Sequence, residues 1–236
     1  MLLKNKNAVI YGGGGAIGGA VARAFAREGA GVHLAGRTRE SLEEVADAIR
    51  ATGGTAEIDQ VDALDEAAVD RHADAVAERA GSLDISFNLI SWAEVQGTPL
   101  AEMPLADFER PVHNAVRTMF LTSRAAARHM MRQKSGVILA FGGYGDPPRN
   151  HYLGGFQVAF GAVESLRRNL ACELGPHGIR VLTLQTGGVP ETIPLGFEWG
   201  KAITEEIARN TMLGRPPHSP TSAMWRSSPP RTWLVL

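Results

Sequence analysis

The stretch YGGGGAIGG (residues 11–19) decides the fold. It follows an apolar run, NAVIY (7–11), that is typical of a buried strand, and it opens a helical stretch that continues to about Glu28. In this context glycines allow a tight turn and close backbone approach to a pyrophosphate, and the helix N-terminus presents free N–H groups. The stretch therefore predicts a phosphate-binding cradle; the alternative is a glycine-rich structural turn.

Outward from this stretch, short apolar runs alternate with helical stretches. We expect strands at 7–11, 32–36, 55–61, 83–90, 136–141 and 179–185, and further helices at about 40–51, 65–80, 104–132 and 151–175. Strand–helix repeats at this spacing indicate a parallel sheet with right-handed crossovers. The predicted fold class is α/β: a Rossmann-type, doubly wound parallel sheet with helices on both faces.

Composition excludes several classes of function. The chain of 236 residues has 24 basic and 25 acidic residues and no long run of either sign, so we expect neither nucleic acid nor a membrane surface as a partner. No apolar run is long enough to span a membrane, no secretory signal is recognisable, and the lone Cys172 cannot form an internal disulfide. The histidines have no ligand-like spacing, so no metal site is predicted. A cytoplasmic location fits best.

The glycine stretch resembles a known motif. Gly12, three residues, Ala16, one residue and Gly18 follow the spacing of TGxxxGxG in the short-chain dehydrogenase/reductase family, with Tyr11 replacing Thr and Ala16 replacing Gly. The resemblance covers about residues 5–215, strongest at 11–19 and 161–181. It implies a nicotinamide-nucleotide-binding protein of oxidoreductase descent.

Two further residues match the family's cofactor site. Asp62 resembles the acidic residue that the family uses at the adenine, and Asn88 sits at the first Asn of the NNAG motif, whose remainder is absent. The alternative for Asp62 is an ordinary N-cap of the helix at 65–80. The cofactor-binding set implied by the resemblance is Gly12, Gly15, Ala16, Ile17, Gly18, Arg37, Asp62, Ala63 and Asn88.

The end of the second strand bears on the choice of cofactor. An acidic residue there would bind the ribose hydroxyls and exclude a 2′-phosphate, but Gly36 occupies the place, followed by Arg37 and Arg39. A guanidinium suits a phosphate monoester, so NADP is favoured over NAD. The alternative is that Arg37 is a solvated loop charge.

The family's catalytic residues are largely missing. Its reaction uses a tyrosine, a lysine four residues later, a serine and an asparagine. The match over 161–181 places Phe156 at the tyrosine, Phe160 at the lysine and Gly143 at the serine, and only Asn114 remains as a remnant of the tetrad. A phenylalanine cannot transfer a proton, so acid–base assistance of roughly 10²–10⁴-fold would be lost.

Substitute acid–base groups have to be considered. None of the tyrosines of this chain is followed four residues on by a lysine. Tyr144 beside the vacant serine position, and His151 and Tyr152 before Phe156, could line the cleft. The alternative is that Tyr152 and His151 start a helix and Tyr144 packs in a loop.

The C-terminal segment breaks the resemblance. We expect a single dinucleotide-binding domain over 1–215 and an atypical tail at 216–236, rich in Pro, Ser, Arg and Trp. Back-translated with G/C-rich codons and read two bases over, residues 215–233 can give a sequence that resembles the family's closing segment. We therefore hypothesise a frameshift; sequencing the coding DNA across Gly214 tests it, since an uninterrupted frame with different codons would remove the idea.

Three functions stay open. The first is an NAD(P)-binding protein with weak or no ordinary carbonyl reductase activity. The second is a divergent NADP-dependent oxidoreductase with a substitute acid–base group, and the third is a noncatalytic nucleotide sensor or structural subunit. The expected partners are a nicotinamide nucleotide, an unidentified small-molecule substrate if any, and copies of the chain in a homo-oligomer, because the family commonly forms dimers and tetramers.

Overall fold

A computed structural model describes residues 1–143, 152–186, 189–190 and 200–210. In chain order its elements are β1 (Asn7–Tyr11), α1 (Ala16–Arg27), β2 (Gly31–Gly36), α2 (Arg39–Arg50), β3 (Thr55–Gln60), α3 (Glu66–Ala80), β4 (Ile85–Asn88), α4 (Leu105–Gln133), β5 (Gly136–Gly143), α5 (Phe156–Leu174), the 3-10 helix η1 (Gly175–His177), β6 (Ile179–Thr186) and α6 (Gly200–Asn210). The tail expected at 216–236 lies outside the described residues.

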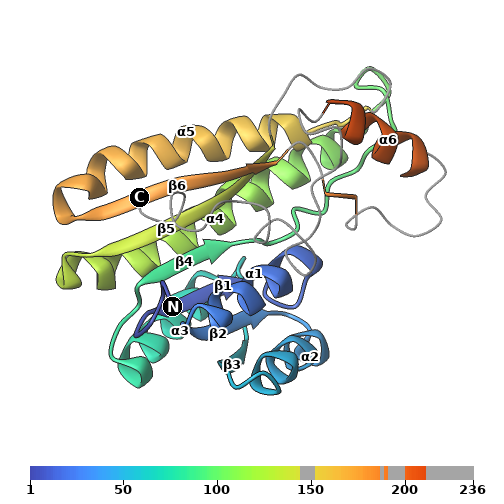
Figure 1. Ribbon diagram of the computed structural model, residues 1–236. Helices are drawn as coiled ribbons and strands as arrows, with labels where there is room; N and C mark the ends of the chain where they lie inside the picture. Colours follow the sequence, from blue (N-terminus) through green and yellow to red (C-terminus); the bar gives the residue numbers. More distant parts are fainter. Residues whose placement is uncertain (144–151, 187–188, 191–199, 211–236) are drawn as a thin grey trace.

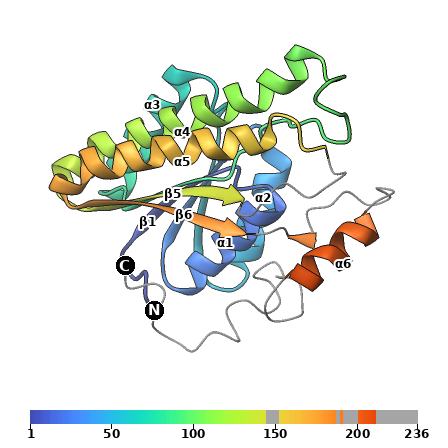
Figure 2. The same ribbon diagram turned by 90° about the horizontal axis from the view of Figure 1, so that it is seen from above.

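The six strands form one parallel sheet in the order β3-β2-β1-β4-β5-β6. Helices α3, α4 and α5 lie along one face, and α1 and α2 cover the other (Figures 1 and 2). The strand order reverses between β1 and β4, and folds of this kind bind ligands outside the carboxyl ends of the strands at such a switch point. The predicted doubly wound α/β fold is confirmed.

Two apolar clusters sandwich the sheet. On β1, Val9 and Tyr11 face the α3–α5 side, whereas Ala8 and Ile10 face the α1–α2 side. The central strands are therefore buried on both faces, which explains why their sequences lack polar alternation. Among the described residues no helix is both long and apolar enough to cross a membrane.

Two expected boundaries were wrong. The strand expected at 83–90 ends at Asn88, because the Asn88 side-chain oxygen accepts the Ile90 backbone N–H at 3.1 Å and turns the chain. The helix expected from about 151 begins at Phe156. Tyr152 and Gly154 have positive φ angles of 45° and 56°, which a right-handed helix cannot contain.

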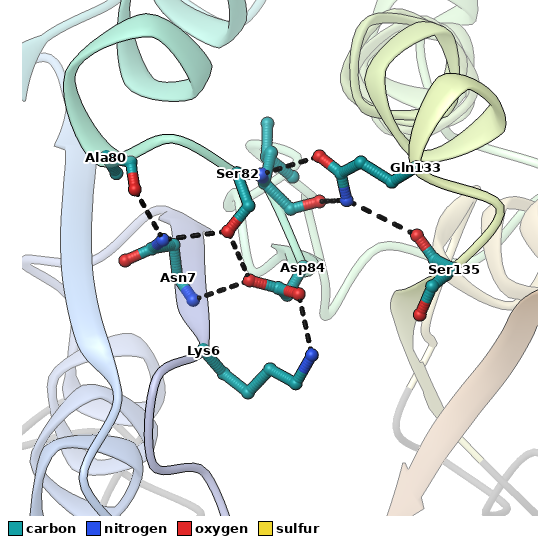
Figure 3. Close-up of polar contacts among 8 residues, drawn as sticks. Lys6, Asn7, Ala80, Ser82, Asp84, Gln133 and Ser135 are labelled. Atoms are coloured by element: carbon teal, nitrogen blue, oxygen red, sulfur yellow. Dashed lines mark hydrogen bonds and ion pairs between the residues drawn. The ribbon is translucent and has the colours of Figure 1, made fainter.

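Polar side chains close the amino edge of the sheet, at the opposite end from the ligand-binding edge (Figure 3). The Asp84 carboxylate accepts hydrogen bonds from the Lys6 ammonium (2.9 Å), the Asn7 backbone N–H (3.0 Å) and the Ser82 hydroxyl (2.6 Å). Burial opposes ionisation of Asp84, but these bonds outweigh it and lower the pKa of the carboxyl group. The amino edge is thus fixed by its own side chains.

Candidate functional site

The glycine stretch folds back between β1 and α1. The Gly12 and Gly13 backbone N–H groups both donate to the Ala35 carbonyl oxygen of β2, at 2.8 and 3.2 Å, and the Gly15 N–H donates to the Gly12 carbonyl at 3.0 Å. Gly12 has a φ of +80°, a conformation that glycine adopts without steric cost. The turn therefore holds the start of α1 close to the end of β1.

Side chains could not be added at most of these glycines. A Cβ atom at Gly12 would lie 2.3 Å from the Leu89 carbonyl oxygen, and one at Gly18 would lie 2.1 Å from the Gly12 carbonyl oxygen. At Gly15, by contrast, the one neighbouring atom of the described residues within 4 Å would be the Gly12 oxygen at 3.3 Å. The turn is tightly packed on its inner side and open at the helix N-terminus.

No side chain of the described residues caps the N-terminus of α1. The N-cap Gly15 has no side chain to accept the first amides, and the first turn contains no acidic residue. The first N–H groups of a helix have no acceptors within the helix, and the helix dipole favours negative charge there. Ala16, Ile17 and the buried Gly18 supply these amides, and helix N-termini of this kind are where proteins commonly bind phosphate groups.

The end of β2 places a cation beside this turn. Arg37 is exposed, and its backbone carbonyl accepts a hydrogen bond from the Gln60 side chain at 2.7 Å. Arg39 is paired with Glu43 at 2.8 Å. In the described part of the chain the Arg37 guanidinium has no ion pair.

The alternative interpretation of Asp62 as a helix N-cap was wrong. The N-cap of α3 is Asp65, whose carboxylate accepts the Ala68 backbone N–H at 3.0 Å. Asp62 is exposed, and its carboxylate accepts the Leu64 backbone N–H at 3.0 Å, while Ala63 is buried. The turn after β3 thus presents the Asp62 side chain at the ligand-binding edge of the sheet.

Two asparagines stabilise the backbone near the switch point. Asn88, at the end of β4, is buried and donates to the Thr122 hydroxyl at 3.2 Å. Asn114, on α4, donates to the Trp92 backbone carbonyl at 3.1 Å. Both therefore fix the segment that follows β4, next to the cleft.

Aromatic rings occupy the expected catalytic positions. The Phe156 and Phe160 rings lie with centroids 4.5 Å apart, and both make edge contacts with Trp92, at 5.7 and 4.9 Å. A Cβ atom at Gly143 would lie 2.7 Å from Cε2 of Phe160. The Phe160 ring therefore fills the space that a serine side chain at residue 143 would need. We call Trp92, Phe156 and Phe160 the aromatic cluster.

Trp92 was missed in the sequence. It is 8% exposed and follows β4 in a segment without regular structure, so no periodicity marks it as a core residue. The resemblance itself drew attention to the missing NNAG residues rather than to what came after them. Its partners on α5 are more than sixty positions away along the chain, and only the fold brings them together.

Of the three expected substitute acid–base groups, the structure describes only Tyr152. Tyr144 and His151 lie outside the described residues. Tyr152 is 44% exposed, and its backbone carbonyl accepts the Gly97 N–H at 3.0 Å. No group of His, Cys, Asp or Glu side chains within the described residues could hold a metal ion.

A cavity of about 240 Å³ lies beside Phe160, between β5, β6 and α5. Its acidic residue, Glu164, is bound by the Arg167 guanidinium at 2.7 and 2.9 Å and by the Thr183 hydroxyl at 2.9 Å. The Arg167 hydrogen bonds are the main cause that lowers the pKa of Glu164 to about 2. The carboxylate is therefore held ionised as a structural group, and it is a poor proton donor near neutral pH.

Comparison with known proteins supports the resemblance. A family model described as enoyl-(acyl carrier protein) reductase matches residues 14–222. The 7α-hydroxysteroid dehydrogenase of Escherichia coli strain K12 is 29% identical over 239 residues, which cover 98% of this chain and 91% of that protein.

Solved structures agree with the sequence comparison. A short-chain type dehydrogenase/reductase from Mycobacterium marinum has a TM-score of 0.78 at 28% identity, over 93% of this chain and 85% of that one. A metagenomic short-chain oxidoreductase, solved in complex with NADP, has a TM-score of 0.70 at 28% identity, over 80% and 85% of the two chains. This chain therefore belongs to the short-chain dehydrogenase/reductase family of oxidoreductases.

Proposed function

We propose that this chain binds a nicotinamide dinucleotide and does not catalyse ordinary carbonyl reduction. The observation that carries the proposal is the contrast at two glycines. The Gly15 end of the turn is open toward the free amides of α1, whereas the space over Gly143 is filled by the Phe160 ring. One half of the cleft would receive a pyrophosphate, and in the other half the described positions 143, 156 and 160, where the resemblance puts the serine, the tyrosine and the lysine, carry no side chain that can move a proton.

The residues of the cradle fit the phosphate part of the cofactor. The amides of Ala16, Ile17 and Gly18 would bind the pyrophosphate oxygens, because they lack acceptors within the helix. Asp62 would bind the adenosine part of the cofactor. Asn88 would orient the backbone around it, and the buried Ala63 would pack beneath it. NADPH, when bound, would supply the hydride.

We favour NADP over NAD as the ligand. Arg37 is exposed at the end of β2 without an ion pair in the described residues, and no acidic side chain stands at Gly36 to repel a 2′-phosphate. A guanidinium forms paired hydrogen bonds with phosphate oxygens. The metagenomic relative solved with NADP is consistent with this choice. Arg37→Glu should reverse the preference in a titration with both nucleotides.

The proposed lack of activity follows from the chemistry of the aromatic cluster. Phe156 and Phe160 stand at the positions where the resemblance puts the tyrosine and the lysine, and neither ring can donate or accept a proton. A carbonyl that receives a hydride needs a proton on its oxygen. Without a positioned donor the step loses roughly 10²–10⁴-fold in rate.

Binding and turnover are separated in one experiment. NADPH and NADH are titrated into the chain by fluorescence, and a panel of carbonyl compounds is then added while absorbance at the nicotinamide band is followed. We expect binding without oxidation. Oxidation above the uncatalysed rate would instead support the divergent oxidoreductase, with Tyr152 as the group to substitute first.

We also propose that the protein works in the cytoplasm as a homo-oligomer. The lone Cys172 is exposed and unpaired, as suits a reducing compartment. Several apolar side chains on α4 and α5, among them Phe120 and Val158, are more than 40% exposed in the single chain. Light scattering of the purified protein measures the oligomeric state directly.

A further inference from the structure

A polar network lies beneath the cradle, on the α3 side of the sheet. The Tyr11 side chain at the end of β1 is 1% exposed, and its hydroxyl lies 3.2 Å from Nδ1 of His72 on α3. The two rings meet edge to face with centroids 5.5 Å apart. Tyr11 thus points away from the cleft that its neighbour Gly12 helps to form.

The network continues to β3. His72 is 6% exposed, and its Nε2 lies 3.4 Å from an Asp59 carboxylate oxygen, which in turn accepts from the Arg79 guanidinium at 2.7 Å. Tyr11, Ala35 and Asp59 are paired across β1, β2 and β3, so they form one row of the sheet. Ala35 carries only a methyl group between the two polar side chains.

The protons of this network can be assigned. Burial, with the nearby charges of Asp70 and Asp59, raises the pKa of Tyr11, so the phenol keeps its proton. Burial opposes ionisation of Asp59, but the nearby His72 imidazole and the hydrogen-bonded Arg79 guanidinium outweigh it and lower the pKa of Asp59 to about 2. An ionised carboxylate accepts only. With the His72 imidazole neutral and its proton on Nε2, the Tyr11 hydroxyl is the donor to Nδ1, and Nε2 faces an Asp59 oxygen 3.4 Å away.

We propose that Tyr11 and His72 are positioning residues for nucleotide binding, which hold the end of β1 so that the glycine turn keeps its shape. This inference rests on the proposed nucleotide site. Tyr11 directly precedes Gly12, and its backbone carbonyl accepts the Leu89 N–H at 2.9 Å. Its side chain adds an anchor on α3, the helix that follows the Asp62 turn.

Anchoring of the end of β1 matters because the glycine turn is tightly packed against its neighbours. A Cβ at Gly12 would already be 2.3 Å from the Leu89 oxygen, so a small movement of β1 against β4 changes the turn. Burying a phenol and an imidazole costs free energy unless they are hydrogen-bonded, and each supplies the bond that the other needs. An apolar pair could fill the volume but would not fix the orientation.

The test compares two buried hydroxyl deletions. Tyr11→Phe removes the hydrogen bond to His72. Thr118→Val removes a fully buried hydroxyl whose one hydrogen bond in the described residues is to the Ala115 carbonyl of its own helix, at 3.4 Å. We expect the dissociation constant for NADPH to rise about three- to tenfold in Tyr11→Phe, the scale of one hydrogen bond, and to stay unchanged in Thr118→Val. Thermal unfolding checks that both variants are folded.

A second pair of variants separates positioning from general destabilisation. In His72→Gln the side-chain amide can still accept from Tyr11 and donate to Asp59, so NADPH affinity should be largely retained, whereas His72→Leu should lose as much as Tyr11→Phe. The double variant Tyr11→Phe/His72→Leu should bind no more weakly than either single variant, because both remove the same bond. Additive losses would overturn the inference.

Nitrogen chemical shifts of the His72 imidazole give a readout that does not need the nucleotide. We expect the proton on Nε2 in the wild-type chain; a proton on Nδ1 would contradict the assigned network. Equal NADPH affinity in Tyr11→Phe and wild type would overturn this inference and leave the proposed function intact. No NADPH binding by the wild-type chain would overturn the proposed function and, with it, the positioning role.

Discussion

Glycine has opposite effects in the two halves of the cleft: the cradle half, formed by the glycine turn at residues 11–19, and the catalytic half, around Gly143, Phe156 and Phe160. In the cradle half, Gly12 and Gly18 let backbone pack against backbone, and the N-cap Gly15 makes no side-chain hydrogen bond to the first amides of α1. In the catalytic half, Gly143 lets an aromatic ring approach, and the ring of Phe160 takes up the space. We propose that the first arrangement keeps a surface that binds the nucleotide and that the second removes a reactive one, so that nucleotide binding and proton transfer are separate in this chain.

The largest effect on stability should come from the aromatic cluster. Trp92 is 8% exposed and contacts both phenylalanines, so Trp92→Ala should lower the free energy of unfolding by about 3 kcal/mol or more. Urea denaturation measures it. A change below about 1 kcal/mol would show that the cluster is not a packed unit, and would weaken the contrast between the two halves.

The next effect concerns the cradle half. Gly18→Ala places a methyl group 2.1 Å from the Gly12 oxygen, so the turn has to move, and NADPH affinity should fall roughly a hundredfold, the scale on which an ångström of misplacement acts. Gly161→Ala is the matched control: it is also a helical glycine, but its Cβ would have nothing within 4 Å. The control should leave affinity unchanged and stabilise α5 by about 0.5–1 kcal/mol. Equal NADPH affinities in the two variants would contradict the proposal that the glycine turn binds the phosphates.

A smaller effect tests the filled space directly. Gly143→Ser should destabilise the chain by about 1–3 kcal/mol, because its Cβ would lie 2.7 Å from the Phe160 ring. In a Phe160→Ala background the same substitution should cost much less. Chemical denaturation of the four proteins in this double-mutant cycle gives the coupling energy. A coupling energy near zero would show that the ring does not occupy the serine's space.

The smallest expected effect is a difference between the two halves in how their contribution to stability depends on pH. Burial is the main cause that lowers the pKa of His33, on β2 in the cradle half, so protonation favours the unfolded chain. The free energy of unfolding therefore decreases as pH falls below the ordinary histidine pKa of about 6.5, by at most about 1.4 kcal/mol at pH 5.5. Glu164, in the catalytic half, has a lowered pKa of about 2, so the stability it contributes is lost only below its unfolded value, as pH falls toward 2.

His33→Leu should therefore flatten the loss between pH 7.5 and 5.5. Thermal unfolding at the two pH values measures this difference, with Glu164→Gln as the comparison, which should lower stability similarly at both pH values. An unchanged pH dependence in His33→Leu would show that the buried imidazole is not the group that titrates.

The fold and the glycine turn between β1 and α1 could be predicted because their signals are local. The run 11–19 contains the turn, the glycines and the helix start, and each strand–helix pair can be recognised on its own. His72 also carries a local signal: with Val69, Ala73 and Val76 it has the spacing of one helix face, and all four are buried. What the sequence could not show was its partner, because Tyr11 is 61 positions away.

The catalytic half was harder to predict from the sequence, because its contacts also join residues far apart along the chain. The resemblance predicts Phe156 and Phe160 at the tyrosine and lysine positions, but the contact of Trp92 with both rings is created only by the fold. The role of Asp65 as the α3 cap was also missed, because two aspartates three positions apart both suit an N-cap, and backbone geometry decides between them.

The most direct test of the separation between binding and chemistry is one titration followed by one assay. NADPH is titrated into the wild-type chain, and carbonyl compounds are then added while absorbance at the nicotinamide band is recorded. The account predicts saturable binding and no oxidation above the rate without protein. Saturable binding followed by rapid oxidation would contradict it, because proton transfer would then have to come from a group other than Phe156 and Phe160.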